Sequence, residues 1–445
     1  KAVVFGTTIL GSNPSAPART MKKISLDFDL INKFKNIFFP FYKSKEVKKL
    51  FDVLEQGEPK NKKVAMFVGG CVRNYILKNL IDDLDLATVF TPEEIKAKFK
   101  NTSFKVIETG VEHGSVTILL NNYKFELTTL RKDVSTDGRH AEVKFTDDWK
   151  EDSNRRDFTI NAIYLDKNGK LFDPQLGEKD LQNNVVKFIG DPGKRIEEDY
   201  LRIIRFIRFS IQYDHNTLES STINAIKLNL IGIKKLSKER ILKELLKILS
   251  LQNFSNIFKN QELKNIFLII FPEFKNLDRI KKLSYFSEES LLRIDTNMIL
   301  AILLIDGSDN FLYFCHKYKV PNLTKNKLEL LSRFIKEVKE DKNFFKKNIK
   351  KNTYFLGKDF LKSLAIFLFF ENKSFKYKEL NLIFKNIEIT SVPKFPFDGE
   401  FLKKRGFTEG KKIGLALKEL ESDWVKNNFY LSEDNINTIL EKVKN

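Results

Sequence analysis

The character of this sequence changes once along its length, at about residue 190, and that change limits the folds it can adopt. Strand-like runs, Gly pairs and turn signals lie in residues 60–165. Beyond them, apolar residues recur at spacings of three and four, as on one face of a helix, for example in residues 195–210 and 238–249. Gly and Pro stay sparse until residues 393–414. We therefore expect an α+β protein, with a small mixed domain followed by helices.

Local patterns in the first part predict individual elements. Residues 115–120 and 123–129 are strand-like and flank Asn121-Asn122, a pair typical of a tight hairpin turn. Residues 92–99 have helical spacing and begin with Pro, directly after a Thr that can cap the helix. The strands of this domain are therefore expected to be mostly neighbours in sequence.

The net charge of +19 favours a polyanionic partner. It arises from 78 Lys and Arg against 59 Asp and Glu in a chain of 445 residues. Such an excess attracts nucleic acid or an anionic membrane surface. A codon bias that also explains the 41 Phe residues would produce the same charge without any partner. Charge alone leaves these alternatives open.

Several function classes are excluded by what the sequence lacks. Cys71 and Cys315 stand alone, which argues against a disulfide framework and a thiolate zinc site and fits a reducing compartment. None of the four His residues is followed by Asp, so the ligand pair of an HD-type phosphohydrolase is missing. No apolar run approaches the roughly 18 residues of a membrane span. Residues 1–20 differ in composition from the rest of the chain, and we expect a tag or leader segment there, with Met21 as the natural start.

A glycine pair and two aspartates form the first candidate site. Gly69 and Gly70 follow the strand-like residues 64–68, and such a pair lets the backbone approach a phosphate, although it is often a simple turn. Asp83 and Asp85 are one residue apart, which on a strand places both carboxylates on one face. Two such carboxylates can bind the divalent metal ions that hold a nucleoside triphosphate. An exposed acidic loop is the alternative.

A third carboxylate strengthens the metal interpretation. Glu126 lies within the apolar strand of residues 123–129, where a charged group needs a partner or a metal. An Asp-x-Asp pair on one strand with a later acid on a neighbouring strand is a known way to build a nucleotidyl-transfer site.

Five blocks of the sequence, taken in order, resemble one enzyme family. The first four resemble the class II tRNA nucleotidyltransferase and bacterial poly(A) polymerase family: GGCVRN with DLDLAT, FELTTLRKDVSTDGRHAEVKF, RRDFTINAI and EEDYLRIIRFIRF, in residues 69–209. The loop of residues 129–143 resembles the CCA-adding branch found in alphaproteobacteria and mitochondria. A fifth block, residues 395–424, is similar to the tail of that branch. The chain departs from the family at Asn74, where Asp is usual, and around Lys78, where Gly is usual.

The resemblance implies a fold and a domain order. A polymerase-β-like nucleotidyltransferase head is expected first, followed by an all-helical neck, body and tail. It implies template-independent addition of C, C and A to tRNA from CTP and ATP, with two Mg²⁺ ions held by Asp83 and Asp85 and with Glu126 as the third catalytic carboxylate. The expected boundaries are residues 21–185 for the head, 186–255 for the neck, 256–385 for the body and 386–445 for the tail.

The RRD block contains residue types that suit a nucleotide. The guanidinium group of arginine binds phosphate oxygens in pairs, and a carboxylate accepts a hydrogen bond from a ribose hydroxyl. An isolated Arg-Arg-Asp sequence is, however, more often a surface ion-pair cluster. With the resemblance, the residues expected at the triphosphate and ribose are Gly69, Gly70, Arg73, Arg155, Arg156 and Asp157.

Base recognition is expected from residues 198–202, which we predict to be helical. Glu198, Asp199 and Arg202 would then share one face, a spacing that also fits ordinary salt bridges on a helix surface. The resemblance implies that Asp199 and Arg202 read the incoming base and that Glu198 orients Arg202. C and A each present an amine beside a ring-nitrogen acceptor, which matches a carboxylate beside an arginine, whereas U and G present the reverse. Arg205 and Arg208 are expected to add phosphate contacts.

A polar, turn-rich stretch lies after the third carboxylate and resembles the family's flexible loop. Its residues include Arg131, Asp133, Asp137, Gly138 and Arg139. A smaller block with Asp173 and Gly177 resembles the family's hinge.

Two other functions remain in competition with CCA addition. A poly(A) polymerase would use the same site, and a catalytically inactive RNA-binding protein would keep the charge without the chemistry. The expected partners are tRNA and nucleoside triphosphates, with no membrane and no protein partner implied. The expected location is the cytoplasm, or the mitochondrial matrix for a eukaryotic source.

Overall fold

The structure is a computed structural model that describes residues 40–81, 83–111, 114–136, 141–215, 217–291 and 294–444. The predicted leader of residues 1–20, Met21 and the loop residues Asp137, Gly138 and Arg139 lie outside these ranges. The chain divides into two compact units, one that ends at Leu236 and one that begins at Ser237.

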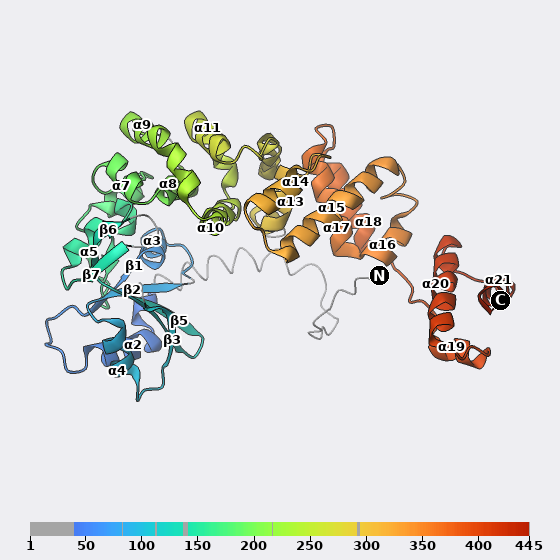
Figure 1. Ribbon diagram of the computed structural model, residues 1–445, viewed down its shortest axis with the longest axis horizontal. Coiled ribbons are helices and arrows are strands. Elements are labelled where there is room, and N and C mark those ends of the chain that lie inside the picture. Colours follow the sequence, from blue (N-terminus) through green and yellow to red (C-terminus); the bar gives the residue numbers. More distant parts are fainter. Residues whose placement is uncertain are drawn as a thin grey trace. The chain divides into compact units, whose positions relative to one another are not determined.

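The N-terminal unit is built on a mixed β-sheet (Figure 1). Among the described residues, seven strands pair in the order β3-β4-β5-β2-β1-β8-β9, while β6 and β7 form a separate hairpin. β2 runs parallel to β5 and antiparallel to β1. The strand bounds are β1 Ala65–Val68, β2 Leu84–Thr88, β3 Lys105–Gly110, β4 Ser115–Leu120, β5 Tyr123–Thr129, β6 Arg131–Thr136, β7 Ala141–Phe145, β8 Tyr164–Leu165 and β9 Leu171–Phe172.

Local sequence signals account for several of these elements. The predicted hairpin is confirmed: β4 pairs antiparallel with β5, and Asn121 takes the left-handed conformation (φ 52°) that Asn tolerates well. In β5, Phe125, Leu127 and Thr129 are buried, and Glu126 lies on the other face. The helix predicted over residues 92–99 is confirmed as α4.

The N-terminal unit also contains helices. They are α2 Lys45–Glu55, α3 Gly70–Ile76, α4 Pro92–Phe99, α5 Trp149–Arg155, α6 Gly177–Gln182, α7 Pro192–Glu198, α8 Leu201–Gln212 and α9 Ser220–Asn229, with 3₁₀ turns η1 Phe41–Lys43, η3 Thr159–Asn161 and η4 Leu230–Lys235.

The prediction of one continuous helix through residues 198–202 is wrong. α7 ends at Glu198 and α8 begins at Leu201. Between them Asp199 is extended (φ −154°, ψ 104°), and its side chain accepts a hydrogen bond from the backbone N–H of Leu201 at 3.1 Å. A carboxylate that satisfies an unpaired amide at a helix start favours a break at this position.

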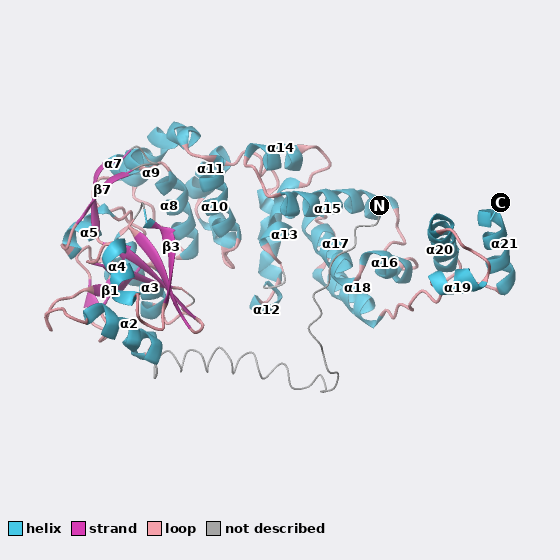
Figure 2. Ribbon diagram, turned by 60° about the horizontal axis from the view of Figure 1, so that its bottom comes forward, coloured by secondary structure: helices cyan, strands magenta, loops and turns pink. Residues whose placement is uncertain are grey.

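The described elements of the C-terminal unit are all helices, and the strands of Figure 2 all belong to the N-terminal unit. α10 begins after Ser237, whose hydroxyl accepts a hydrogen bond from the N–H of Arg240, and it spans the residues for which helical spacing was noted. Its elements are α10 Lys238–Leu249, η5 Phe254–Lys259, α11 Gln261–Ile270, η6 Leu277–Tyr285, α12 Glu288–Leu291, α13 Thr296–Leu304, α14 Asn310–Lys317, α15 Asn322–Glu340, α16 Ile349–Leu356, α17 Lys358–Glu371, α18 Tyr377–Ile389, α19 Gly399–Lys404, α20 Gly410–Lys426 and α21 Glu433–Lys444.

Apolar burial organises this helical unit. α13 is buried from Met298 to Leu304, and it packs against α15 and α17. The last three helices, α19 to α21, share a small core of their own, which consists of Leu402, Phe407, Ala416, Leu420, Ile436 and Leu440. Within the described ranges, no helix is long and apolar enough to cross a membrane. The predicted α+β fold class, with a sheet-bearing first part followed by helices, is confirmed.

Candidate active site

Two of the three predicted carboxylates lie side by side in the sheet. β2 and β5 are parallel neighbours, and their register pairs Asp85 with Glu126. Asp83 is exposed and lies just before the first residue of β2, so it flanks the strand that was expected to include it. Burial raises the pKa of Asp85 to about 6, and the negative charges of Glu126 and Asp83 add to this effect. The fold therefore concentrates negative charge at the beginning of β2.

These carboxylates fit a Mg²⁺ ion that is also bound by substrate phosphates and water. Within the described part of the chain, no group of three or more His, Cys, Asp or Glu side chains is arranged to hold a metal by itself. Mg²⁺ is usually held by one or two carboxylates together with substrate phosphates and water, and not by an all-protein cage. Asp85, disfavoured as an isolated anion by burial and by two neighbouring carboxylates, is the kind of group that a divalent cation stabilises.

The glycine pair lies against Asp85. Gly69 follows β1 with φ 79°, and a Cβ at this position would lie 3.5 Å from Oδ2 of Asp85. The thiol of Cys71 donates to the carbonyl of Val68 at 3.3 Å and to that of Asp85 at 3.6 Å, which ties the start of α3 to β2. The glycine turn is therefore held directly beside the carboxylate of Asp85.

A buried aspartate holds both predicted triphosphate arginines. Asp152 is fully buried and accepts hydrogen bonds from Nε of Arg155 at 2.8 Å, from Nη2 of Arg156 at 2.9 Å and from the hydroxyl of Tyr164 at 2.7 Å. Burial alone would raise the pKa of Asp152, but the two guanidinium groups outweigh it and hold the pKa at about 2. The pair is therefore an anchored cluster and not a solvated surface ion pair. The positive charge of Arg156 also lowers the pKa of Asp85, which opposes the dominant effects of burial and the neighbouring carboxylates.

A chain of polar contacts runs from α3 to α8. Arg73 donates through Nε to the hydroxyl of Tyr213 at 2.8 Å and through Nη1 to the side-chain oxygen of Asn161. Asn161 donates to Oδ1 of Asp157 at 2.6 Å, and Nε of Arg205 donates to Oδ2 of Asp157 at 2.6 Å. These contacts connect the helix after the glycine pair to the helix that carries Arg202.

The carboxylate of Asp157 is ionised within this chain. It is 8% exposed, and burial alone would raise its pKa, but Arg205 and the amide of Asn161 lower it well below the usual range. Both of its oxygens already accept hydrogen bonds. The structure thus gives Asp157 a bridging contact in addition to the ribose contact expected from the sequence.

The predicted base-reading residues meet at the junction of α7 and α8. Nη1 of Arg202 donates to Oε2 of Glu198 at 2.6 Å and to the carbonyl of Arg195 at 2.8 Å, so Glu198 and Arg202 are in direct contact. The carbonyl of Asp199 accepts from the N–H of Arg202 at 3.0 Å. Although the helix is broken here, the three residues remain together.

Three arginines lie around the ring of Phe209. The guanidinium carbons of Arg73, Arg205 and Arg208 lie 5.0, 5.7 and 3.9 Å from its centroid. Cation–π contacts of this kind hold positive charge beside a buried ring without neutralising it. Arg208 is thereby positioned close to the rest of the site.

The described part of the predicted flexible loop is attached to α5. Arg131 is the first residue of β6, and its N–H donates to Oδ1 of Asp152 at 3.4 Å. Asp133 pairs with Val143 across the β6–β7 hairpin, next to an irregularity in the register. Gly177, in the predicted hinge block, lies so close to Thr159 that a Cβ would come within 2.1 Å of the Thr159 carbonyl oxygen.

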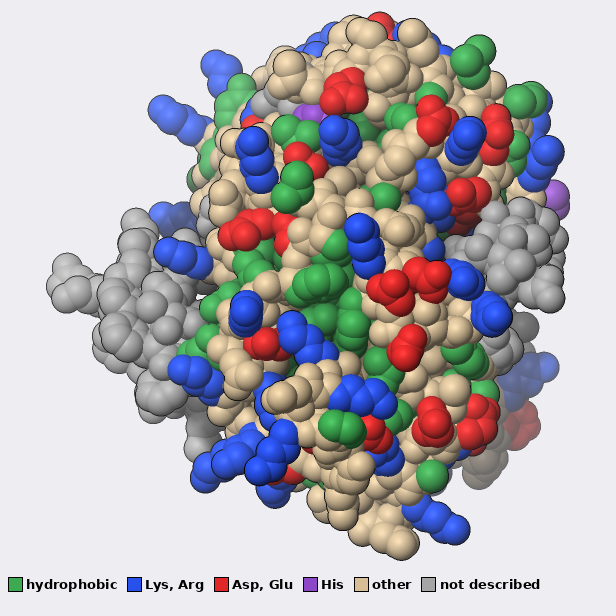
Figure 3. Space-filling model, turned by 90° about the vertical axis from the view of Figure 1, so that its left-hand side faces the viewer, with side chains coloured by type: hydrophobic (Ala, Val, Ile, Leu, Met, Phe, Trp, Pro, Cys, Tyr) green, Lys and Arg blue, Asp and Glu red, His purple; other side chains and the backbone are tan. Residues whose placement is uncertain are grey.

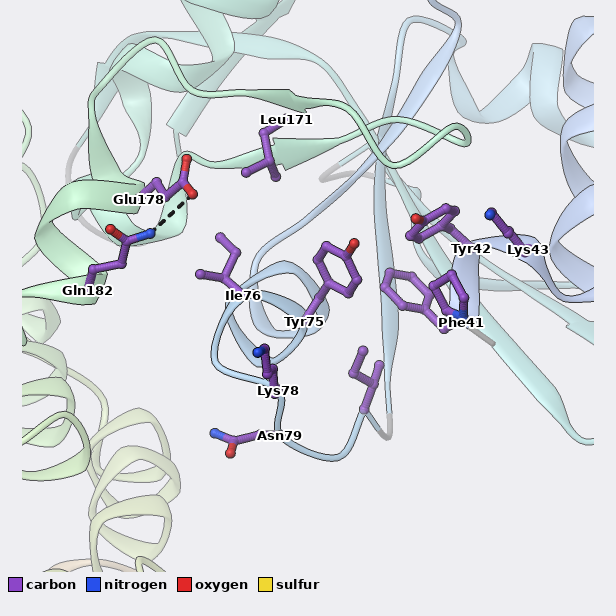
Figure 4. Close-up of a pocket in the computed structure, with 12 residues that line it drawn as sticks. Phe41, Tyr42, Lys43, Tyr75, Ile76, Lys78, Asn79, Leu171, Glu178 and Gln182 are labelled. Carbon is purple, nitrogen blue, oxygen red and sulfur yellow. Dashed lines mark hydrogen bonds between the residues drawn. The ribbon is translucent and has the colours of Figure 1, made fainter. Parts of the chain in front are cut away.

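A cavity of about 460 Å³ lies at the other end of α3 (Figure 4). Its lining includes Phe41, Tyr42, Tyr75, Lys43 and Lys78, and none of the predicted site residues. On the face shown in Figure 3, Lys and Arg side chains are interspersed with Asp and Glu, so the net charge is not separated into one uniform patch there.

Four residues of this network were not predicted from the sequence: Asp152, Asn161, Arg195 and Tyr213. Asp152 stands three and four residues before the two arginines that it holds, and this helical ion-pair spacing could have identified it. Asn161 and Tyr213 contact Arg73 across 88 and 140 residues, and no local pattern signals contacts of that range.

Comparisons with known proteins bear on the family and the fold. The family model described as "Poly A polymerase head domain" matches residues 65–187, and the one described as "Probable RNA and SrmB- binding site of polymerase A" matches residues 217–277. The CCA-adding enzyme of Bacillus stearothermophilus, crystallised in complex with CTP, superimposes with a TM-score of 0.66 at 21% identity and covers 90% of this chain and 98% of that one. This likeness supports the fold.

Relatives in sequence extend along most of the chain. The protein of Danio rerio named CCA tRNA nucleotidyltransferase 1, mitochondrial, is 32% identical over 391 residues, which is 85% of this chain and 87% of that protein. The Homo sapiens protein of the same name is 34% identical over 393 residues, 84% of this chain and 86% of that protein. Identity at this level over most of both chains confirms the resemblance, and this chain belongs to the CCA tRNA nucleotidyltransferase family.

Proposed function

We propose that this enzyme adds C, C and A in turn to the 3′ end of tRNA, using CTP and ATP and releasing pyrophosphate. The observation that carries the proposal is the pairing of Asp85 with Glu126 beside the glycine turn, together with the arginine network that surrounds it. Relatives named for CCA addition that align over most of their length support the choice of substrate.

The reaction is a nucleotidyl transfer. The 3′-hydroxyl oxygen of the RNA bonds to the α-phosphorus of the triphosphate, and the bond from that phosphorus to the bridging oxygen breaks. Pyrophosphate leaves, and the proton of the hydroxyl passes to water. We infer that Asp83 and Asp85 hold Mg²⁺, with Glu126 as the neighbouring third carboxylate. Bound Mg²⁺ would supply Lewis-acid stabilisation of the developing negative charge. Because burial and two acidic neighbours disfavour the charge of Asp85, a bound cation would stabilise its ionised form.

The arginines are proposed to receive the triphosphate. Arg155 and Arg156 are anchored by Asp152, and Arg73 by Asn161 and Tyr213, so each guanidinium has a set direction before substrate arrives. Preorganised charges of this kind stabilise phosphate oxygens without further ordering cost. Asp157 is proposed to favour a ribose over a deoxyribose, either directly or through Asn161, which it holds.

Base choice is proposed to reside in Asp199 and Arg202. A carboxylate that accepts from the exocyclic amine and a guanidinium that donates to the ring nitrogen match both C and A. Arg202 is only 10% exposed, so a base with the opposite polarity would leave buried groups unpaired.

The same site could serve poly(A) synthesis, and the head-domain match to poly(A) polymerases keeps that alternative open. We propose tRNA as the partner because the lysine-rich helices suit a folded RNA, and we place the enzyme in the cytoplasm. A mitochondrial location is the alternative, which the relatives named mitochondrial support.

One assay separates these functions. The enzyme is given tRNA that lacks its 3′ end, with labelled CTP alone, ATP alone, or both. CCA addition predicts two C residues with CTP alone and a complete end with both nucleotides. Long tails from ATP alone would indicate a poly(A) polymerase, and no incorporation in the presence of Mg²⁺ would indicate an inactive RNA-binding protein.

A further inference from the structure

The end of α5 is held by an arginine that belongs to a different helix. Arg195, on α7, donates from Nη2 to the backbone carbonyls of both Arg155 and Arg156. These two residues are the last of α5 and its C-cap, where carbonyl groups lack partners within the helix. A guanidinium is well suited to this position, because its planar fork can serve several acceptors at once.

The same arginine contacts the partner of Arg202. Nη1 of Arg195 donates to Oε2 of Glu198 at 2.7 Å, and Nη1 of Arg202 donates to that same oxygen at 2.6 Å. Arg202 in turn donates to the backbone carbonyl of Arg195 at 2.8 Å, and its Nη2 approaches the carbonyl of Arg155 at 3.5 Å. Helices α5, α7 and α8 are therefore joined through one small cluster.

The buried charges of this cluster reduce the stability of the fold. The side chains of Arg195 and Arg202 are only 12% and 10% exposed, and a single carboxylate lies between them. Burial and the charge of Arg202 lower the pKa of Arg195. Its Nε has no hydrogen-bond partner among the described residues. Buried like charges of this kind are often replaceable by apolar side chains without loss of stability, so their presence points to a role in the site.

We propose that Arg195 is a positioning residue that joins base recognition to triphosphate binding. This inference rests on the proposed function of the neighbouring residues. The fork of Arg195 fixes the backbone from which Arg155 and Arg156 project, and it also fixes Glu198, which orients Arg202. A base that hydrogen-bonds to Arg202 therefore places its triphosphate where Arg155 and Arg156 can bind it. A mismatched base does not.

The test compares Arg195 with Arg279, since each contacts two backbone carbonyls and one carboxylate. Arg195→Lys keeps the charge but has one nitrogen in place of the two that separately serve the carbonyls and Glu198, and Arg195→Met removes the charge. The control is Arg279→Lys in the C-terminal unit: Arg279 donates to the carbonyls of Ile302 and Ile305, at 2.9 and 2.8 Å, and pairs with Glu371. Its contacts resemble those of Arg195, but it lies outside the predicted site.

The readouts are kcat/KM for CTP and for UTP on tRNA lacking its 3′ end, equilibrium binding of both nucleotides, and the melting temperature. We expect both Arg195 variants to lower the CTP-to-UTP ratio by about tenfold or more, the scale on which a misplaced recognition group reduces discrimination. Arg279→Lys should lower the melting temperature and leave the ratio at the wild-type value.

Each outcome has a distinct meaning. A wild-type ratio in Arg195→Lys, or an equal fall in Arg195→Lys and Arg279→Lys, would overturn the positioning role. Nucleotide binding provides the same comparison without turnover, so it still tests Arg195 if a variant is inactive. A wild-type enzyme that fails to incorporate CTP would instead refute the proposed function, whatever the Arg195 variants do.

Discussion

Asp85 and Glu126 occupy paired positions on the parallel strands β2 and β5, with Asp83 just before the first of these strands. Lys124 forms an ion pair with Glu126 from the same strand. Asp85 is the most buried of the three carboxylates, and burial together with its two acidic neighbours raises its pKa to about 6. The apoprotein therefore holds a carboxylate whose ionised form is disfavoured by its surroundings.

Replacing Asp85 should stabilise the apoprotein and abolish incorporation. Asp85→Asn removes a disfavoured negative charge, so in EDTA we expect a gain of about 1–2 kcal/mol in the free energy of unfolding. Added Mg²⁺ should raise the melting temperature of the wild type and have little effect on the variant, because ligands stabilise the state that binds them. The measurements are thermal unfolding with and without Mg²⁺ and CTP incorporation. Wild-type turnover in the variant would contradict the assignment of Asp85 as a metal ligand.

Base discrimination should depend on Asp199 and Arg202. Asp199→Ala removes the proposed acceptor for the amine of C or A, and Arg202→Ala removes the donor to the ring nitrogen. Each should reduce kcat/KM for CTP and ATP and bring the CTP-to-UTP ratio closer to one, because the unpaired groups that penalise U are removed as well. Glu197→Ala, at an exposed acid on α7 two residues before Asp199, serves as the control. If both variants lose activity at an unchanged ratio, specificity lies elsewhere.

Binding of tRNA should weaken steeply with salt and depend on the last three helices. The chain carries a net charge of +19, and Lys403, Lys404, Lys411 and Lys412 are exposed on α19 and α20. Because helices α19 to α21 have their own core, deletion of residues 391–445 should leave the remaining domains folded. We expect the deletion to reduce tRNA affinity and the salt slope while CTP affinity is retained. Salt-independent tRNA binding would leave codon bias as the better account of the charge.

Stability should fall below neutral pH because of His215. It is 6% exposed, Nδ1 accepts from the N–H of Val186 at 3.4 Å, and burial lowers the pKa of its imidazole below 6.5. The unfolded chain therefore takes up a proton at a higher pH than the folded one, and stability decreases as pH falls through 6.5 toward the folded-state pKa, by at most about 1.4 kcal/mol per pH unit. His215→Asn should flatten the dependence measured by urea unfolding between pH 7 and pH 5. His316→Asn, at an exposed position, should not.

Much of the local structure could be predicted from the sequence. Alternation and turn chemistry predicted the β4–β5 hairpin, helix-start signals predicted α4, and apolar spacing predicted α10. These features depend on neighbouring residues only, so a period of two or of about 3.6 and a capping side chain suffice to indicate them. The continuous helix through residues 198–202 failed because the side chain of Asp199 competes for the amide of Leu201, a choice that hydrophobic spacing does not reveal.

By itself, then, the sequence determined the order of a sheet-bearing part and a helical part, and it placed Asp85 and Glu126 on strands, whereas Asp83 lies just before β2 and not on it. Only the tertiary structure decided that Asp85 pairs with Glu126, that Asp152 anchors Arg155 and Arg156, and that Arg73 reaches Asn161 and Tyr213. The physical reason is the separation in sequence between the residues that determine each feature. Strand order and long-range hydrogen bonds depend on how the whole chain buries its apolar surface and satisfies its buried polar groups, whereas periodicity and capping report only on residues a few positions apart.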